Sequence, residues 1–315
     1  MMFPFFRKKK QLRIGVDVSD EVVSIMQLSL EGSSYCVTGY VSAALPVGAV
    51  VEREIKDVQL VGAIIRDLVK KRKWQGDEVV IGLPRHVVMT QVIPLQKELS
   101  DAEISEHMDN NLSRYVSIPT DEINFDFTVL GENKCNSDLR DFLLVVCRSQ
   151  SVNSVIELAD VARLQLKAID IETLVMERVI NQMTSLLYEN EKNKTIALME
   201  VASKKLTLYV VDNQKLMYTR DHFINDAHMS ALDHMNNGLQ LFKSSTGFQT
   251  IDTIILSNNH YAQEKQLEKR LGSSIGTVEL LKNVLPASLA KEAPQTVDSL
   301  DLIRCYGLAL RGFMS

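Results

Sequence analysis

Between residues 14 and 28 the chain reads Ile14-Gly-Val-Asp-Val-Ser-Asp-Glu-Val-Val-Ser-Ile-Met-Gln-Leu28. Residues alternate in type on both sides of a short polar turn, which predicts two antiparallel strands joined by a tight hairpin. Asp17 stands where the first strand ends. The stretch therefore predicts a hairpin that holds a carboxylate at the edge of a sheet.

A similar hairpin returns in the second half of the chain, as Ala197-Leu-Met-Glu-Val-Ala-Ser-Lys-Lys-Leu-Thr-Leu-Tyr-Val210. In an alignment without gaps, Asp17 falls on Glu200 and Ser19 falls on Ala202. One hairpin used twice predicts two related domains that face a cleft. This is the layout of the actin-like ATPase fold, so we expect an α/β protein of that class.

Composition limits the classes of function. The chain has 315 residues, of which 45% are hydrophobic, and this is enough for two domains because single cores stop growing at roughly 250–300 residues. A net charge of −5 and a pI of about 5.8 exclude a globally basic nucleic-acid surface. The four cysteines are far apart and form no C-x-x-C pair, which predicts free thiols in a reducing compartment.

Residues 1–10 place three phenylalanines before four cations. A secretory signal has the opposite order and a longer apolar core, and no apolar run in the chain approaches the roughly 20 residues that span a bilayer. Two interpretations of this tail stay open. It is either a frayed soluble segment or a weak contact with an anionic membrane surface.

The order of strand and helix patterns predicts the domain organisation. We expect a first actin-like domain at 11–78 plus 166–190, and a second at 191–315. Residues 79–165 are predicted to form an inserted strand–helix–strand–strand α+β module.

Local signals mark several elements within this plan. Asp57 is predicted to cap a helix at 58–72, and the capping box Ser100-Asp-Ala-Glu103 is predicted to start a helix that ends near Tyr115. Pro94 is predicted to end the strand 87–93.

A set of short motifs, taken in their order and spacing, resembles the PilM family of type IV pilus assembly, which is itself similar to FtsA. The motifs are Gly15-Val-Asp17, Met26-Gln-Leu-Ser29, Leu45-Pro-Val-Gly-Ala49, Val80-Ile-Gly-Leu-Pro84, Tyr115-Val-Ser-Ile-Pro119, Ile123-Asn-Phe-Asp-Phe-Thr-Val-Leu130, Ile169-Asp-Ile-Glu172 and Tyr306-Gly-Leu-Ala-Leu-Arg-Gly312.

The resemblance implies a cytoplasmic protein, peripheral at the inner-membrane face. Its partner would be the bitopic inner-membrane protein PilN, which belongs to the pilus alignment complex. The N-terminal peptide of PilN would lie in a groove between the first domain and the inserted module. Arg114, Tyr115, Phe125 and Phe127 are the candidate residues for this groove.

The nucleotide motifs of this chain depart from the family pattern. The first turn of the family resembles Asp-Ile-Gly-Ser-Ser-Ser-Val-Lys, whereas this chain has Asp17-Val-Ser-Asp-Glu-Val-Val-Ser24. Ser19 replaces a glycine that lets the backbone approach phosphate, and Asp20 adds a charge that repels it. The second turn has Ala202 after Glu200, and two further Gly-Gly pairs become Asn225-Asp226 and Asn258-Asn259.

The remnant of a nucleotide site therefore comprises Asp17, Ser19, Asp20, Glu200, Ala202 and Asn258. We expect a non-catalytic scaffold with no cofactor, similar to the degenerate relatives MshI and HofM. The first alternative is a PilM protein that binds ATP and magnesium, with Asp17 and Glu200 holding a metal-bound water. The second alternative, an FtsA-like filament former, would need an amphipathic C-terminal helix, and the sequence ends at Arg311-Gly-Phe-Met-Ser315.

Two other patterns are predicted to carry no chemistry. Gly272-Ser-Ser-Ile-Gly276 matches the nucleophile-elbow pattern, but a helix is predicted before it, so a helix-ending turn is the better interpretation. His222, His228 and His234 recur every six residues, which places neighbours on different helix faces and does not favour a metal site.

Overall fold

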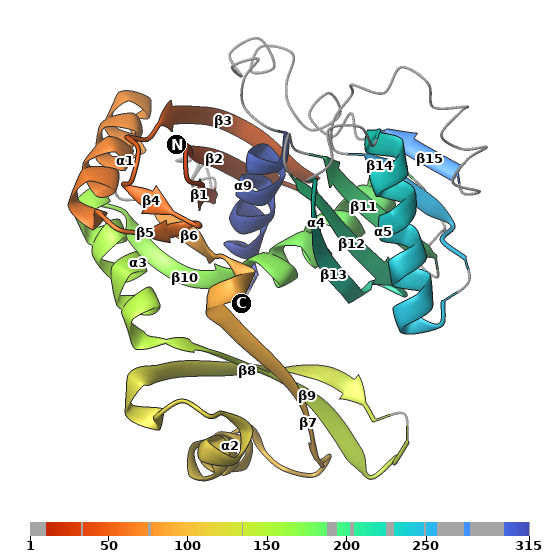
Figure 1. The fold of residues 1–315 in the computed structure, drawn as a ribbon. Helices are drawn as coiled ribbons and strands as arrows, with labels where there is room; N and C mark the ends of the chain where they lie inside the picture. Colours follow the sequence, from red (N-terminus) through yellow and green to blue (C-terminus); the bar gives the residue numbers. More distant parts are fainter. Residues whose placement is uncertain are drawn as a thin grey trace, which may run out of the picture.

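The computed structural model describes residues 11–32, 34–74, 77–133, 135–187, 194–201, 205–224, 230–248, 250–256, 274–277 and 299–314. Two five-stranded sheets stand side by side, and a three-stranded sheet with one helix forms a separate module below them (Figure 1). The described part of the chain contains no helix that is long and apolar enough to span a membrane.

The first sheet has the order β10-β6-β1-β2-β3. Its strands are β1 (Leu12–Val18), β2 (Val22–Glu31), β3 (Ser34–Ala44), β6 (Glu78–Leu83) and β10 (Gln165–Ile171). Strands β1 and β2 pair antiparallel with Asp17 opposite Ser24, so the predicted hairpin is confirmed. Strand β6 pairs parallel to β1 on its other side.

The second sheet repeats this plan in the order β13-β12-β11-β14-β15. Its strands are β11 (Thr195–Val201), β12 (Lys205–Asp212), β13 (Lys215–Phe223), β14 (Thr253–Leu256) and β15 (Ser274–Thr277). Strands β11 and β12 pair antiparallel with Glu200 opposite Thr207, and β14 pairs parallel to β11. The predicted internal repeat is therefore present.

Helices cover the sheets according to their apolar faces. α1 (Val58–Arg72) and α3 (Ser149–Ala162) cover one face of the first sheet, and α5 (Ala231–Thr246) packs on the second. α4 (Glu172–Leu187) and α9 (Ser299–Arg311) lie between the two sheets and share one apolar core with both (Figure 1).

The predicted bounds of α1 are also confirmed. The Asp57 carboxylate accepts the Leu60 N–H at 2.9 Å, which satisfies one of the unpaired donors of the first turn. Lys73 ends the helix in a left-handed conformation, and three cations in the last turn complement the negative end of the helix dipole.

The C-terminal helix α9 belongs with the first sheet, although the predicted second domain at 191–315 contained it. It packs against β1, β2 and α4. A Cβ placed on Gly15 of β1 would lie 2.1 Å from the Cys305 carbonyl oxygen and 2.5 Å from the Ala309 nitrogen. Gly15 therefore allows the backbones of β1 and α9 to touch.

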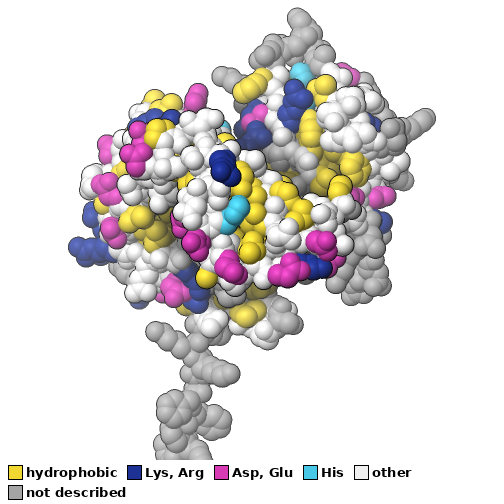
Figure 2. Space-filling model, turned by 90° about the horizontal axis from the view of Figure 1, so that it is seen from below, with side chains coloured by type: hydrophobic (Ala, Val, Ile, Leu, Met, Phe, Trp, Pro, Cys, Tyr) yellow, Lys and Arg dark blue, Asp and Glu magenta, His cyan; other side chains and the backbone are white. Residues whose placement is uncertain are grey.

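The module consists of β7 (Val88–Gln96), α2 (Asp101–Tyr115), β8 (Ile123–Glu132) and β9 (Leu139–Arg148), with the strand order β7-β9-β8. α2 covers one face of this sheet and closes a core of its own around Ile104 and Met108. Figure 2 views the molecule from below, where apolar side chains gather near the middle of the face and acidic side chains border them.

The predicted module at 79–165 was larger than this unit, because it included β6 and α3. Both elements belong to the first domain. β6 pairs with β1 and β10, and α3 buries Val155, Leu158 and Ala162 in the core of the first sheet. The three-stranded sheet and its helix occupy residues 88–148.

Pro94 does not end its strand, since β7 continues through it to Gln96. β7 is an edge strand that pairs with β9 on one side, with Pro94 opposite Asp141. A proline is tolerated on an edge strand because its missing N–H faces away from the partner strand.

The predicted turn at Gly272–Gly276 is wrong in its described part, because Ser274, Ile275 and Gly276 belong to β15. That strand begins earlier than the predicted strand at 277–280 and pairs parallel to β14. The predicted tail at 1–10, linker at 189–193, helix at 261–271 and loop at 291–298 lie outside the described residues.

Candidate functional site

The β1–β2 turn satisfies its own backbone groups. The Ser19 hydroxyl donates to the Val22 carbonyl oxygen at 2.8 Å and accepts the Val22 N–H at 3.1 Å, while the Ser19 N–H donates to the same carbonyl at 2.9 Å. A phosphate-binding turn aims such N–H groups at the anion. Here the Val22 N–H is already bonded to the serine that replaces the glycine.

Asp20 contacts a second hairpin, formed by β4 (Val50–Val51) and β5 (Glu54–Ile55). Its carboxylate accepts the backbone N–H of Glu52 at 3.2 Å and that of Arg53 at 2.5 Å. Glu52 and Arg53 have φ values of 52° and 61°. Asp20, which departs from the family pattern, therefore accepts hydrogen bonds from a turn whose two central residues have a left-handed backbone conformation.

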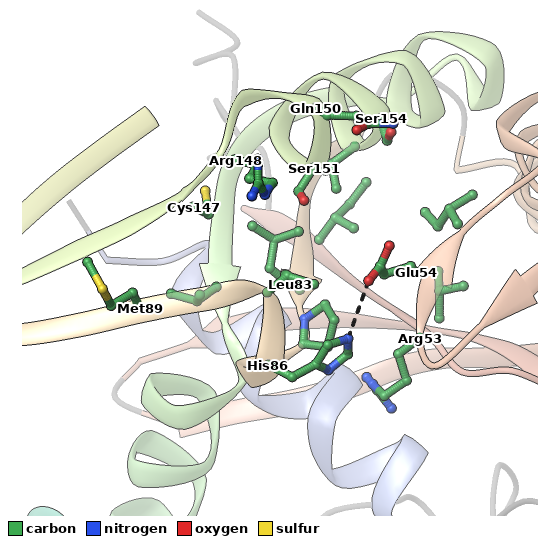
Figure 3. Close-up of a pocket in the computed structure, with 18 of the residues that line it drawn as sticks. Arg53, Glu54, Leu83, His86, Met89, Cys147, Arg148, Gln150, Ser151 and Ser154 are labelled. Carbon is green, nitrogen blue, oxygen red and sulfur yellow. Dashed lines mark ion pairs between the residues drawn. The ribbon is translucent and has the colours of Figure 1, made fainter. Parts of the chain in front are cut away.

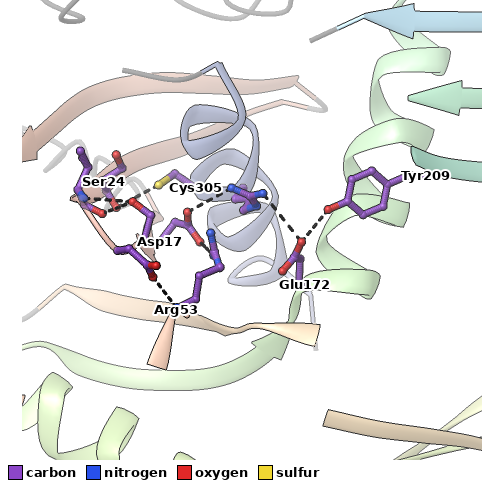
Figure 4. A network of polar contacts seen from close by, with 10 residues as sticks. Asp17, Ser24, Arg53, Glu172, Tyr209 and Cys305 are labelled. Carbon is purple, nitrogen blue, oxygen red and sulfur yellow. Dashed lines mark hydrogen bonds and ion pairs between the residues drawn. The ribbon is translucent and has the colours of Figure 1, made fainter. Parts of the chain in front are cut away.

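A network of polar contacts connects elements of the two halves of the molecule (Figure 4). Arg53 Nη2 lies 2.6 Å from one oxygen of Asp17, and Arg304 Nη1 lies 3.9 Å from the other. Glu172, the first residue of α4, lies 3.9 Å from Arg304 Nη2 and accepts the Tyr209 hydroxyl at 2.6 Å. The network thus joins β1, α9, α4 and β12.

The ionisation of this network follows from its pairing. Burial alone would raise the pKa of Glu172, but the Arg304 and Arg53 guanidinium groups and the Tyr209 hydroxyl lower it to about 2. Burial would lower the pKa of Arg53, but the Asp17 and Glu172 carboxylates together outweigh that effect and raise the pKa. Both Glu172 and Arg53 are therefore charged at neutral pH.

The fit of these described residues to magnesium ATP is poor. Arg53 hydrogen-bonds one oxygen of Asp17, so a magnesium-bound water at that oxygen would have to displace this guanidinium group. The other oxygen lies 3.9 Å from Arg304 and has no hydrogen-bond partner among the described residues. Asp20 is bonded to the β4–β5 turn. Within the described ranges, no group of three or more His, Cys, Asp or Glu side chains is arranged to hold a metal ion.

The structure brings together half of the predicted nucleotide remnant. Asp17, Ser19 and Asp20 share the β1–β2 turn. Glu200 lies in β11 opposite Thr207. Ala202 and Asn258 lie outside the described residues, as do Asn225, Asp226 and His228.

A pocket of about 470 Å³ lies between the first domain and the module (Figure 3). It is bounded by the β4–β5 hairpin, the end of β6, the start of α3 and the adjoining ends of β7 and β9. Its apolar lining includes Leu83, Val88, Ile118, Val146 and Val155, and its polar lining includes Arg53, Glu54, His86, Arg148 and Ser154.

The charged groups of the pocket are paired at its rim. Glu54 lies 2.9 Å from Lys56 Nζ and 3.7 Å from His86 Nε2, and the hydrogen bond from Lys56 lowers the pKa of Glu54. Arg148 lies 3.4 Å from Glu122. Burial raises the pKa of the Cys147 thiol inside the pocket. An apolar interior with a charged rim suits a peptide segment that carries apolar side chains.

The four residues predicted for the groove do not line this pocket. Arg114 is exposed on α2, and Tyr115 hydrogen-bonds His107 at 3.0 Å. Phe125 and Phe127 pack against the module's own core, with Phe127 edge-on to Phe142 at 6.3 Å. Phe125 and Phe127 lie on the face of β8 that α2 covers. The pocket lies elsewhere, where β7 and β9 join the first sheet.

Sequence reasoning missed the residues that line the pocket in their place. Arg53 stands in Val-Glu-Arg-Glu, which contains no glycine, asparagine or proline to mark a turn. Cys147 and Arg148 end a strand that was predicted correctly, but strand alternation does not say which domain lies beside that end. Two of the family motifs gave local signals, since Leu83 and Pro84 of Val80-Ile-Gly-Leu-Pro84 and Ile118 of Tyr115-Val-Ser-Ile-Pro119 line the pocket.

An ion pair next to the pocket joins the two halves of the molecule. Arg85, in the short helix η1 (Arg85–Val87), pairs with Asp221 of β13. The Thr207 hydroxyl donates to the other oxygen of Asp221 at 2.7 Å, and Lys205 Nζ lies 3.7 Å from this carboxylate.

Two related sheets joined by a core and a polar network, with a small module inserted in the first half, are the architecture of an actin-like fold. The structure is similar to a solved "PilM-PilN type IV pilus biogenesis complex", with a TM-score of 0.72 and 15% identity over 95% of this chain and 98% of that one. Residues 15–230 match the family described as "Type IV pilus assembly protein PilM", and the chain belongs to this family.

Two other solved structures are more distantly similar. One is the ethanolamine utilization protein EutJ from Carboxydothermus hydrogenoformans, with a TM-score of 0.48 and 10% identity over 95% of this chain and 89% of that one. The other is the cytoplasmic domain of Epsl, an inner-membrane component of the type II secretion system of Vibrio cholerae. Its TM-score is 0.45, with 10% identity over 92% and 98% of the two chains.

Proposed function

We propose that this chain is a non-enzymatic scaffold in type IV pilus assembly that binds the cytoplasmic N-terminal peptide of a PilN-like bitopic inner-membrane protein. The pocket between the β4–β5 hairpin and the module carries this proposal. Membership of the PilM family and the fold shared with the PilM–PilN complex support it.

The shape and chemistry of the pocket favour a peptide. Its volume of about 470 Å³ accommodates a few side chains, and its apolar walls lie behind a rim of paired charges. Such a rim orients a peptide, while apolar burial supplies most of the affinity. Anchoring by the bitopic partner would hold the scaffold at the cytoplasmic face of the inner membrane, as a component of the pilus alignment complex. A weak membrane contact by residues 1–10 would add to this attachment.

The proposal includes no cofactor and no ATPase activity. The hydrogen bond from Arg53 to Asp17 supports this part, because it engages one of the two oxygens that a metal-bound water would contact. The hydrogen bonds of Ser19 and Asp20 support it as well, since they engage groups that a phosphate would otherwise contact. Nucleic acid is not an expected partner, because the net charge is −5.

A peptide titration tests the partner. The probe is a labelled synthetic peptide of the N-terminal cytoplasmic segment of the PilN-like protein from the same organism. Ser154 lines the pocket on α3, and Ser154→Trp should fill the pocket and weaken binding at least about tenfold, a loss of about 1.4 kcal/mol. Asn153→Trp is the matched control, because Asn153 is the adjacent, exposed residue of the same helix and should leave binding unchanged.

Absence of peptide binding by the unaltered chain would contradict the proposal, and so would equal binding by the Ser154→Trp variant. A thermal shift with millimolar magnesium ATP tests the second part. We expect no change in Tm. Stabilisation by several degrees would instead show that nucleotide binds the folded state and would favour an ATP-binding scaffold.

A further inference from the structure

We propose that Asp20, with Asp17, is a positioning residue for partner binding. These two carboxylates of the former nucleotide hairpin hold the β4–β5 turn, and that turn sets the wall of the pocket. The part of this inference that concerns affinity depends on the proposed function of the pocket. The part that concerns the turn is independent of it.

The β4–β5 turn is built from residues that do not favour its geometry. Val51 pairs with Glu54, which leaves Glu52 and Arg53 as a two-residue loop, and both have positive φ. Such loops prefer Asn-Gly, because asparagine and glycine tolerate the left-handed region. For other L-residues this region is sterically unfavourable, because Cβ approaches the following carbonyl oxygen. The turn therefore needs support from outside itself.

Asp20 supplies that support. Its two carboxylate oxygens accept one backbone N–H each, from Glu52 at 3.2 Å and from Arg53 at 2.5 Å. Hydrogen bonds to an ionised acceptor are among the stronger ones in proteins. The acceptor lies more than 30 residues away in sequence, so its effect is to fix the turn against the first sheet.

Asp17 holds the same turn through a side chain. Arg53 Nη2 lies 2.6 Å from Asp17, whose side chain is only 3% exposed. Arg53 is therefore held at its backbone by Asp20 and at its guanidinium group by Asp17. The two carboxylates act on one residue of the turn from two directions.

The turn leads directly into the pocket. Arg53, Glu54, Ile55 and Lys56 all line it, and Glu54 points toward His86 across the cavity (Figure 3). The Lys56 and Asp57 N–H groups both donate to the Ala49 carbonyl oxygen, which closes this wall just before α1 begins. A turn released from Asp20 would move the wall while leaving the pocket's opposite side, on α3 and β9, in place.

The experiment compares three variants of the full chain. Asp20→Ala removes both acceptors, Asp20→Asn keeps one side-chain oxygen, and Glu21→Ala is the matched control. Glu21 carries the same charge in the same turn and is exposed. Two quantities are measured, namely the affinity for the PilN-like N-terminal peptide and the amide hydrogen-exchange rate of residues 50–57.

We expect Asp20→Ala to weaken peptide binding about tenfold and to raise exchange at Glu52 and Arg53 severalfold, since the loss of two such bonds exceeds 1.4 kcal/mol. Asp20→Asn should fall between Asp20→Ala and the unaltered chain, and Glu21→Ala should match the unaltered chain. Glu52→Asn should partly restore both quantities in the Asp20→Ala background, because asparagine tolerates positive φ.

Unchanged affinity in Asp20→Ala would overturn the inference, and so would unchanged exchange. If the unaltered chain binds no such peptide, the proposed function fails, and exchange alone then decides the role of Asp20 in holding the turn. If Asp20→Ala and Glu21→Ala changed peptide affinity and hydrogen exchange equally, the loss of a charge alone would explain both effects. That result would also overturn the inference.

Discussion

The ionisation of Glu172 depends strongly on the folded structure. It is 9% exposed and stands at the start of α4, between Arg304 and the Tyr209 hydroxyl. The ordinary pKa of 4.5 falls to about 2 in this setting, because the surrounding cations outweigh the cost of burial. A carboxylate of this kind makes the free energy of unfolding depend on pH.

The pH window of this contribution follows from the direction of the shift. Above about pH 4.5, Glu172 is ionised in both the folded and the unfolded chain, and its stabilisation is complete. Between about pH 4.5 and 2 the unfolded chain takes up the proton first, so the stabilisation is lost as pH falls. The shift corresponds to at most about 3 kcal/mol.

Glu172→Gln should therefore lower the free energy of unfolding by about 2–3 kcal/mol at pH 7, and by much less near pH 3. Urea denaturation at both pH values measures this difference. Glu106→Gln, at an exposed position of α2, is the control and should change stability little at either pH. An equal loss at pH 7 and pH 3 would contradict the assignment of the shift to the folded cleft.

Among the elements, α9 and β1 are in close backbone contact, and Gly15 makes this close approach possible. Gly15→Ala would place a Cβ against the backbone of Cys305 and Ala309, which cannot rotate away. We expect a loss of about 3 kcal/mol or more, because a buried helix would have to shift. Thermal or urea unfolding measures it.

Gly238→Ala is the matched comparison for that variant. Gly238 lies inside α5, and a Cβ there would meet the flexible end of Leu206 at 3.3 Å. Alanine is about 1 kcal/mol better than glycine in a helix, so the small crowding is offset and stability should stay within about 1 kcal/mol of the unaltered chain. Equal losses at both glycines would contradict the role assigned to Gly15.

Elements whose signals are local were predicted well from the sequence. The cap at Asp57 and the capping box at Ser100 and Glu103 give the starts of α1 and α2, because capping chemistry involves neighbours in the chain. The position at which each element packs in the fold was predicted less well. α9 follows β15 in sequence but packs on the first sheet, since the contact at Gly15 pairs residues about 290 positions apart.

The candidate site shows the same limit. Phe125 and Phe127 alternate correctly along β8, but the face they occupy is covered by α2, and alternation alone does not say which face a helix covers. Arg53 reaches the site because Asp17 and Asp20 hold it, and neither contact has a sequence signal. Pairings between distant charged residues arise only when the fold brings them together.

At the scale of the whole molecule, the two sheets are joined by one apolar core and by polar contacts at its edges. The core runs from β2 through α4 and α9 to Tyr209 of the second sheet. The Arg53–Asp17 pair connects the pocket to the cleft, and the Arg85–Asp221 pair connects the rim of the pocket to β13. Arg85 lies between the pocket-lining residues Pro84 and His86, so the segment beside the pocket contacts the second half of the molecule.

The Arg85–Asp221 pair should contribute a measurable coupling between the two halves. Both side chains are about a quarter exposed, so we expect about 0.5–1 kcal/mol at low salt, decreasing as ionic strength rises. A double-mutant cycle of Arg85→Gln and Asp221→Asn, followed by urea unfolding at two salt concentrations, isolates this energy. The control cycle is Arg148→Gln and Glu122→Gln, a more exposed pair within the module, which should show coupling near zero. Coupling near zero for Arg85 and Asp221 would mean that the shared apolar core alone holds the halves together.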